Sequence, residues 1–290
     1  MKEFKTYHPI VNLIYFVFII GFSCFFMHPL CLGVSFVCAF LYSVMLKGKR
    51  QIKTNLFIMV PLLVGTGAIN PVFNHQGITI LSYLPGGNPL TLESIIYGLA
   101  AGTMIITVIG WFSCYNEIMT SDKFIYLFGK IIPSLSLVIS MTLRFVPRFS
   151  AQLKTVVNAG KCIGQDISRG SIVKRAKCGL GILSVMTTWS LENAIETADS
   201  MKARGYGYPG RTAFSIYNFD KRDKNTLCII LFLGVYIIFG GIKGAMNFSY
   251  FPFVKGAETS LFGISVFAAY MLFCSYPLII ELLEVRKWKQ

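Results

Sequence analysis

Long apolar runs, separated by short polar and cationic stretches, dominate the pattern of this chain. The runs approach the roughly 20 residues that an α-helix needs to cross a hydrocarbon core about 30 Å thick. The pattern therefore predicts an all-α fold, a polytopic membrane helix bundle with about six spans and a cytoplasmic helical region. The expected spans are residues 10–27, 30–46, 56–69, 95–114, 227–242 and 261–282.

The third run, residues 56–69, is the shortest of the six and contains Pro61. Proline is tolerated inside a membrane helix when neighbouring groups satisfy the backbone carbonyl that it frees. Residues 70–94 follow, with several turn-forming Gly, Pro and Asn residues and one charge, Glu93. This composition predicts a loop on the outer side of the membrane.

Residues 116–226 differ in character, since they carry 16 of the 27 Lys and Arg residues and eight of the 13 Asp and Glu residues. We therefore expect three regions. N-terminal transmembrane helices occupy residues 1–115, a cytoplasmic helical region occupies 116–226, and C-terminal transmembrane helices occupy 227–290.

Part of the cytoplasmic region, residues 124–143, is apolar enough to resemble a further span. Lys130 and Pro133 interrupt this run. A seventh span would also place the C-terminal cations outside, against the tendency of Lys and Arg to stay in the cytoplasm. A helix at the inner membrane surface or packed on the bundle is the preferred interpretation.

The formal net charge of +14 would also fit a nucleic-acid-binding protein. The cations, however, flank the apolar runs, as do the four that lie within residues 47–53. With six spans and both termini in the cytoplasm, the long outer loops hold two cations, Lys243 and Lys255. This charge bias predicts a multi-pass cell-membrane protein whose surroundings are a lipid bilayer and not nucleic acid.

Two amphipathic helices are expected in the cytoplasmic region, because apolar residues recur at three- and four-residue steps over 150–168 and over 180–203. Each pattern ends in Arg followed by Gly. Glycine after the last turn caps a helix, and a cation there complements the helix dipole. Helix termination alone therefore explains one such end. Two in succession also present guanidinium forks suited to carboxylates on a partner.

The apolar stripe of the second helix includes Leu191, Ala194 and Ala198. Two uses of this stripe are open. It either packs as an ordinary core or forms a surface for another membrane protein, since small residues allow close approach of helices.

The sequence resembles the T component of energy-coupling factor transporters, the transmembrane subunit family that includes cobalt-transport permease subunits. Residues 198–206, Ala-Asp-Ser-Met-Lys-Ala-Arg-Gly-Tyr, match the second Ala-Arg-Gly signature of that family. Residues 142–147 resemble the Arg-Phe-Ile-Pro stretch that opens its coupling region, and residues 70–73 with Gly77 give a weaker match. The first signature matches at residues 168–170, where Ser replaces the usual Ala.

The resemblance implies a subunit that binds two cytoplasmic ABC ATPase subunits and one small substrate-binding membrane subunit, the S component. ATP-driven closure of the ATPases would move the two helices, and the S component would take up a vitamin or a metal ion. It implies no catalytic residue, cofactor or metal site. The implied ATPase contacts are Ser168, Arg169, Gly170, Ala203, Arg204 and Gly205, with Arg144 and Pro147 supporting the coupling region.

Three other classes of protein are less favoured. A membrane enzyme would need a reactive cluster, but the histidines His8, His28 and His75 lie outside the expected spans, and the chain has no G-x-x-x-x-G-K-[ST] phosphate loop. A self-sufficient secondary transporter would need broken helices in two matching halves, and Pro61 supplies only one interruption. A membrane scaffold shares the docking prediction but lacks coupling. The transported compound is not readable from the sequence.

Overall fold

The computed structural model describes residues 3–48, 50–83, 89–165, 171–206, 208, 217–256 and 260–287. Across these ranges the chain forms nine α-helices, one short 3-10 helix and two small antiparallel sheets of two strands each. Backbone contacts divide the chain into two units. One comprises residues 1–124 and 217–290, and the other comprises residues 125–216. We call them the span unit and, from the role that the family resemblance implies, the coupling unit.

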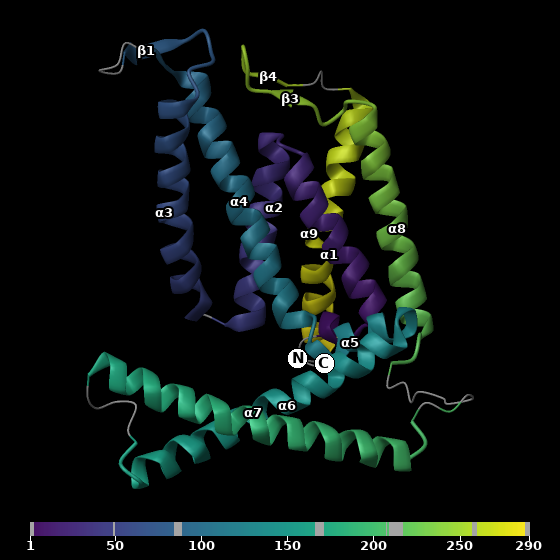
Figure 1. Ribbon diagram of the computed structural model, residues 1–290. Coiled ribbons are helices and arrows are strands. Elements are labelled where there is room, and N and C mark those ends of the chain that lie inside the picture. Colours follow the sequence, from purple (N-terminus) through teal and green to yellow (C-terminus); the bar gives the residue numbers. More distant parts are fainter. Residues whose placement is uncertain are drawn as a thin grey trace. The chain divides into compact units, whose positions relative to one another are not determined.

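The span unit is a bundle of long helices (Figure 1). Its N-terminal elements are η1 (Glu3–Thr6), α1 (Pro9–Phe25), α2 (Pro29–Lys47), α3 (Arg50–Phe73), β1 (Ile80–Tyr83), β2 (Pro89–Thr91), α4 (Leu92–Ile118) and the start of α5 (Ser121–Ile131). Its C-terminal elements are α8 (Lys221–Ile242), β3 (Phe248–Ser249), β4 (Lys255–Gly256) and α9 (Leu261–Lys287).

Five of the described helices are long and apolar enough to cross a membrane: α2, α3 from Gln51, α4, α8, and α9 as far as Leu283. The apolar helix α1 is shorter, at 17 residues. The predicted all-α, multi-pass class is confirmed. The predicted span of 56–69 underestimates α3, which continues through Pro61 and Pro71.

The helices α1 and α2 begin in the same way, with a His-Pro pair. The Nδ1 atom of His8 accepts a hydrogen bond from the backbone N–H of Ile10 at 3.3 Å. At the start of α2, Nδ1 of His28 accepts from the N–H of Leu30 at 3.2 Å. Proline fits the position after each histidine, because a first-turn N–H has no partner inside the helix. The His28 cap starts α2 only a few residues after α1 ends at Phe25, so two spans follow one another almost without a linker.

The core of the span unit is built on Trp111, which is fully buried between α1 and α2. Its Nε1 donates a hydrogen bond to Oγ of Ser35 at 2.9 Å, and Ser35 Oγ lies 2.9 Å from Oγ of Ser23. The ring of Tyr15 stacks on that of Phe273 in α9 with centroids 5.2 Å apart. Aromatic packing around a hydrogen-bonded indole N–H therefore joins α1, α2, α4 and α9.

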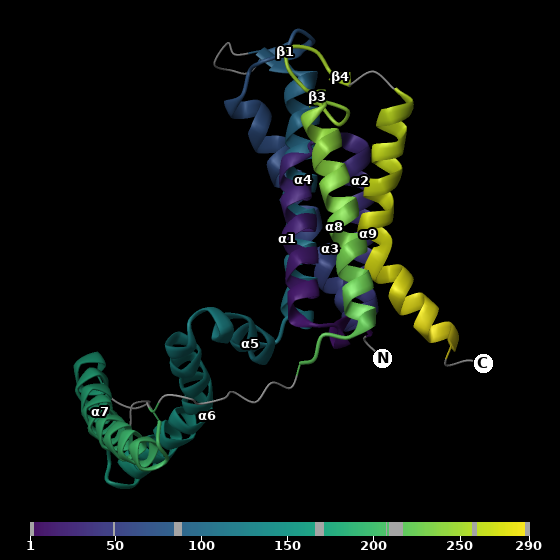
Figure 2. The same cartoon turned by 90° about the vertical axis from the view of Figure 1, so that its right-hand side faces the viewer.

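The two strand pairs lie at one end of the span unit, while the first residues of α1 and α8 and the α2–α3 turn lie at the other (Figures 1 and 2). Residues 80–83 pair with 89–91, and residues 248–249 pair with 255–256. The sequence predicted only a loop over 70–94. The pattern did not indicate the short strands, because strands of three or four residues are too short to show a clear alternation of apolar and polar positions.

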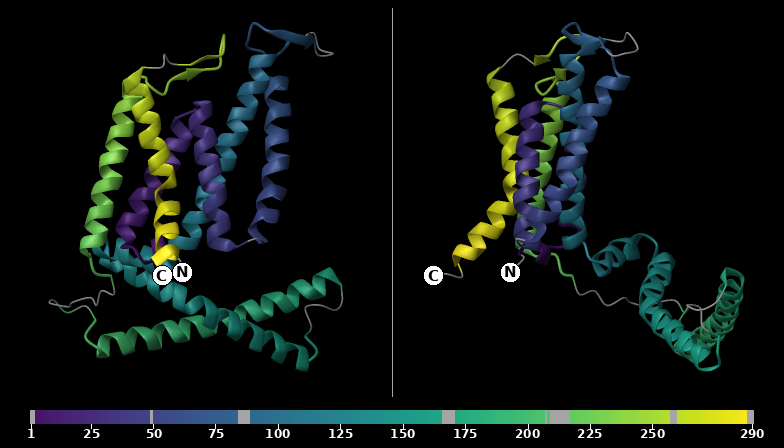
Figure 3. Two further views of the ribbon diagram at one scale, coloured as in Figure 1. Left: turned by 180° about the vertical axis from the view of Figure 1, so that it is seen from behind. Right: turned by 90° about the vertical axis from the view of Figure 1, so that its left-hand side faces the viewer.

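The coupling unit contains the rest of α5, followed by α6 (Pro133–Cys162) and α7 (Ile172–Ala203). The last two helices cross one another (Figures 1 and 3). At the crossing, the rings of Phe149 and Trp189 lie 6.1 Å apart, and the Arg148 guanidinium lies 5.9 Å from the Trp189 ring.

The expected helix limits need correction here. The apolar run 124–143 is split between α5 and α6, with a break before Pro133, where a new helix begins. The helix expected over 150–168 starts at that proline and ends at Cys162. The helix expected over 180–203 starts earlier, at Ile172, where Oγ of Ser171 accepts from the N–H of Lys174 at 3.4 Å.

Candidate functional site

The end of α7 is the part of the predicted contact set that the structure describes. Ala203 is the last helical residue, Arg204 follows it, and Gly205 adopts a left-handed conformation with φ of +75°. The N–H of Gly205 donates to the carbonyl of Lys202 at 3.0 Å, and the N–H of Tyr206 donates to that of Met201 at 3.1 Å. This pair of bonds is a Schellman motif, so the predicted end of the second helix is confirmed.

The Arg204 side chain is exposed. Within the described ranges it makes no hydrogen bond or ion pair, so its five N–H donors are not used by described acceptors of the chain. Lys202 is exposed two residues earlier. The C-terminal end of α7 therefore presents two cations where the helix dipole favours positive charge.

The end of α6 uses the same motif at a different place. The N–H of Gly164 donates to the carbonyl of Lys161 at 3.1 Å, and the N–H of Gln165 donates to that of Gly160 at 2.9 Å. Gly164 has a φ of +78°. The prediction that this helix stops at Arg169-Gly170 is therefore wrong, because a nearer glycine closes it. Ser168, Arg169 and Gly170 themselves lie outside the described residues.

The supporting residues Arg144 and Pro147 lie inside α6 and are exposed. The Arg144 guanidinium lies 5.9 Å from the ring of its neighbour Phe145. The structure does not bring either residue to the end of α7 through any contact between described residues. It shows instead that the next arginine, Arg148, lies at the crossing with α7. Trp189 was not among the predicted contact residues, although a lone Trp in the helical pattern of residues 180–203 is a usable signal.

Apolar side chains on α6 and α7 are left uncovered. In α7 only Ile182 and Met186 are buried, while Leu183 and Leu191 are more than 60% exposed. On α6, Val138 and Val146 are more than half exposed. The stripe of Leu191, Ala194 and Ala198 is exposed rather than packed as a core. Uncovered apolar patches of this kind mark surfaces for a partner or a membrane.

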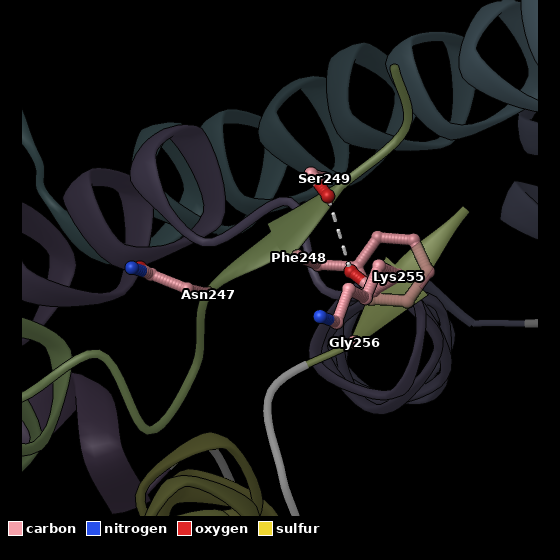
Figure 4. Close-up of a pocket in the computed structure, with 5 residues that line it drawn as sticks. All are labelled: Asn247, Phe248, Ser249, Lys255 and Gly256. Carbon is pink, nitrogen blue, oxygen red and sulfur yellow. Dashed lines mark hydrogen bonds between the residues drawn. The ribbon is translucent and has the colours of Figure 1, made fainter. Parts of the chain in front are cut away.

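Two further observations concern metal binding and pockets. Among the described residues, no group of three or more His, Cys, Asp or Glu side chains could hold a metal ion. A shallow pocket lies on the β3–β4 hairpin (Figure 4). It is lined by one short hairpin, in which Ser249 Oγ donates to the carbonyl of Lys255 at 3.4 Å. It gathers no set of groups that suggests a reaction.

The fold and these helix ends define a multi-pass α-helical membrane protein with a separate helical unit in its chain. No family model matches the sequence. Over 110 residues the chain is 38% identical to the energy-coupling factor transporter transmembrane protein EcfT of Lactobacillus helveticus, a match that covers 37% of this chain and 40% of the relative. The EcfT protein of Leuconostoc gelidum is 32% identical over 116 residues, or 40% of this chain and 42% of the relative.

A longer match is to the energy-coupling factor transporter transmembrane protein EcfT 1 of Listeria monocytogenes. It is 24% identical over 213 residues, or 67% of this chain and 78% of the relative. The chain spans about two fifths of the length of the relatives that match it at the higher identities. The resemblance to the T-component family that the sequence motifs indicated is confirmed by these matches.

Proposed function

We propose that this chain is the transmembrane coupling subunit of an ABC importer of the energy-coupling factor type. It carries motion from two cytoplasmic ATPase subunits to a small substrate-binding membrane subunit, which captures a vitamin or a metal ion. The names of the relatives and the five candidate spans support this proposal. The observation that carries it is the exposed Arg204 guanidinium on the capped end of α7.

The end of α7 suits mechanical contact for two reasons. A helix of 32 residues is a rod about 48 Å long, which moves as one body when its end is pushed. The Schellman motif also fixes the chain direction after the rod, so Arg204 projects from a defined place. A planar guanidinium then binds a carboxylate in an ATPase groove through two parallel hydrogen bonds. Arg169 is the second such contact in this proposal.

In this proposal residues 116–226 face the cytoplasm, with both termini on the same side. The uncovered apolar side chains of α6 and α7 form the surface for the substrate-binding subunit. The chain itself hydrolyses no ATP, because that chemistry belongs to the ATPase subunits, and it binds no nucleic acid.

Purification of the chain in mild detergent, followed by mass spectrometry of the proteins that co-purify, tests the composition. Two ATPase chains and one small hydrophobic protein are expected. ATP-driven uptake of radiolabelled riboflavin, thiamine, biotin, folate or cobalamin, tried in turn, then tests the activity. Uptake by the chain without any ATPase would support a secondary transporter, and ATPase binding without uptake of any substrate would support a scaffold.

Charge reversal at Arg204 tests the contact itself. Arg204→Glu should lower ATP-driven uptake and ATPase co-purification at least tenfold, because truncating one side of a buried charged contact costs about 2–5 kcal/mol. Lys202→Glu is the matched control, since it makes the same charge change at an exposed position on the same turn. If Arg204→Glu and Lys202→Glu lower uptake and ATPase co-purification to the same extent, Arg204 does not make the proposed contact.

A further inference from the structure

A group of buried charged and polar side chains lies at the end of the span unit where α1 and α8 begin. Lys123, near the start of α5, is only 4% exposed. Its Nζ donates to the carbonyl of Lys5 at 2.5 Å and to the carbonyl of Tyr7 at 3.4 Å. The Asn12 amide, oriented so that both of its atoms are satisfied, accepts from Nζ at 2.7 Å and donates to the carbonyl of Phe4 at 3.1 Å.

Three oxygen atoms therefore surround an ammonium group that has three protons to donate. The three come from neutral groups of the first dozen residues. None is a carboxylate. The contact ties the start of α5 to the segment Glu3–His8, which precedes the first span.

The start of α8 is bound to the same segment. Asp223 is 3% exposed, and its Oδ1 accepts from the N–H of His8 at 3.4 Å. The Arg222 guanidinium lies 4.2 Å from the centre of the Tyr7 ring and 3.4 Å from Oε2 of Glu3. It also donates to Oγ1 of Thr6 at 3.2 Å.

The segment that receives these contacts is itself fixed in the core. The ring of Phe4 is fully buried and meets the ring of Tyr15 edge to face, with centroids 5.4 Å apart. Tyr15 in turn stacks on Phe273 of α9. The segment Glu3–His8 is therefore continuous with the aromatic core of the spans.

Lys123, Arg222 and Asp223 lie close in sequence to the two places where the chain passes between the span unit and the coupling unit. The chain leaves the span unit after Phe124 and returns to it at Tyr217. Lys123 immediately precedes Phe124, the last residue before the departure, and Arg222 and Asp223 lie within seven residues of the return. Both covalent connections to the coupling unit are thus fastened to one segment of the span unit. Energetic coupling between distant sites travels through contiguous contacts of this kind.

We propose that Lys123, Arg222 and Asp223 clamp both connections onto the segment Glu3–His8, and that this clamp transmits the motion of the coupling unit to the spans. The clamp rests on the proposed coupling function, because it has a role only if the coupling unit is moved. Its residues are positioning residues, since none of them is placed to touch ATP or a transported compound.

Taking an ammonium out of water is costly. Lys123 offsets that cost by donating to the carbonyl oxygens of Lys5 and Tyr7 and to the Asn12 amide, and a methionine of similar length would leave these acceptors without this donor. A group that holds three backbone and amide oxygens also fixes the direction of the chain as it leaves the spans.

The test compares uptake with ATP hydrolysis in the complete complex. Lys123→Met should leave co-purification of the ATPases and their ATP hydrolysis within twofold of wild type, while uptake of the radiolabelled vitamin that wild type accumulates falls at least tenfold. The number of ATP molecules hydrolysed per molecule transported should therefore rise. Lys154→Met, at an exposed lysine of α6, is the matched control and should behave as wild type.

Arg222→Met is the second variant, because its side chain is 48% exposed and its loss opens no core. Arg222→Met should show the same rise in ATP consumed per molecule transported. If the Lys123→Met protein does not fold in the cell, the result for Arg222→Met alone tests the clamp. Normal uptake in these variants, or an equal fall in uptake and ATP hydrolysis, would overturn the clamp while leaving the coupling function intact. Wild-type chain that binds no ATPase would instead overturn the coupling function.

Discussion

Lys123 shows at the residue scale how burial and charge oppose each other in this protein. The pKa of the Lys123 ammonium is lowered to about 8, chiefly by burial and also by nearby Lys5, while Asp223 acts in the opposite direction. Between pH 8 and the ordinary value of 10.5, the unfolded chain binds a proton that the folded chain has released. The free energy of unfolding therefore rises with pH over this window, and below pH 8 the cost of burying the charge is constant.

This linkage predicts a pH-dependent difference between wild type and Lys123→Met. From pH 7 to pH 9.5 wild type should gain about 2 kcal/mol relative to the variant, since one pKa unit corresponds to about 1.4 kcal/mol. The measurement is the melting temperature of each purified protein in one detergent at both pH values. For the exposed control Lys154→Met, the difference in melting temperature from wild type should be the same at both pH values. If the difference for Lys123→Met is also the same at both pH values, the Lys123 amine is not a buried group that titrates in this range.

Glycines decide at the element scale where helices end and how closely they approach. The sequence predicted the end of α7 at Ala203 correctly, because Gly205 is the first glycine after a long helical pattern. It placed the end of α6 too far along, since apolar spacing continues to Ile167 although Gly164 already adopts a positive φ. Periodicity records which face is apolar, and it does not record which of several glycines takes the left-handed conformation.

The same limit explains which parts of the site were predictable. The spans follow from runs of apolar residues, and Arg204 follows from a local pattern of residues in order. The Lys123 contacts join residues 118 positions apart, and the His8–Asp223 contact joins residues 215 positions apart. No local pattern encodes such pairs, because the folded bundle alone brings them together.

The α3–α4 pair depends on close approach of backbones. A Cβ on Gly98 of α4 would lie 2.9 Å from the carbonyl oxygen of Thr66 and 3.3 Å from Cα of Gly67, both in α3. Small residues at such an interface let membrane helices pack without a hydrophobic driving force. Only 6% of the apolar window of α3 is buried inside the chain, so this contact carries much of its attachment.

Gly98→Leu should therefore destabilise the protein by about 1–3 kcal/mol through overpacking. The expected readout is a lower melting temperature in detergent, together with faster proteolysis of α3. Gly65→Leu is the matched control on α3, because a Cβ there meets no atom within 4 Å. Equal stability of the two variants would show that α3 and α4 do not rely on this close approach.

At the scale of the whole molecule, charge distinguishes the two ends of the span unit. The start of α1, the end of α2, the end of α4 and the start of α8 lie at the same end of the span unit (Figure 1). In sequence Lys5 precedes α1, Lys47 ends α2 and Lys123 follows α4, and the first four residues of α8 include three further cations. The strand-pair end holds Lys255 and the nearby Lys243. The positive-inside tendency therefore predicts that the strand pairs lie outside the cell and that the first and last helix ends lie in the cytoplasm.

Cysteine labelling tests this orientation, because four native thiols are buried and the other four are partly or fully exposed. Cys31, Cys38, Cys114 and Cys274 are buried and stay in place, so the core is untouched. Cys24, Cys178 and Cys228 are replaced by Ala, which leaves Cys162 of α6 as the exposed thiol. A second protein also loses Cys162 and gains Ser82→Cys on β1, where Ser82 is exposed.

In intact cells a membrane-impermeant maleimide should label the Ser82→Cys protein, and it should label Cys162 only after the membrane is permeabilised. The reason is that the cations at the starts of α1 and α8 resist translocation and stay in the cytoplasm. The opposite end of the spans, which carries the strand pairs, is then the end that is translocated to the outside. A protein with neither exposed thiol gives the background from the four buried cysteines. Labelling of Cys162 in intact cells would place the coupling unit outside, where no ATP-hydrolysing partner could reach Arg204, and the coupling proposal would fall with the orientation.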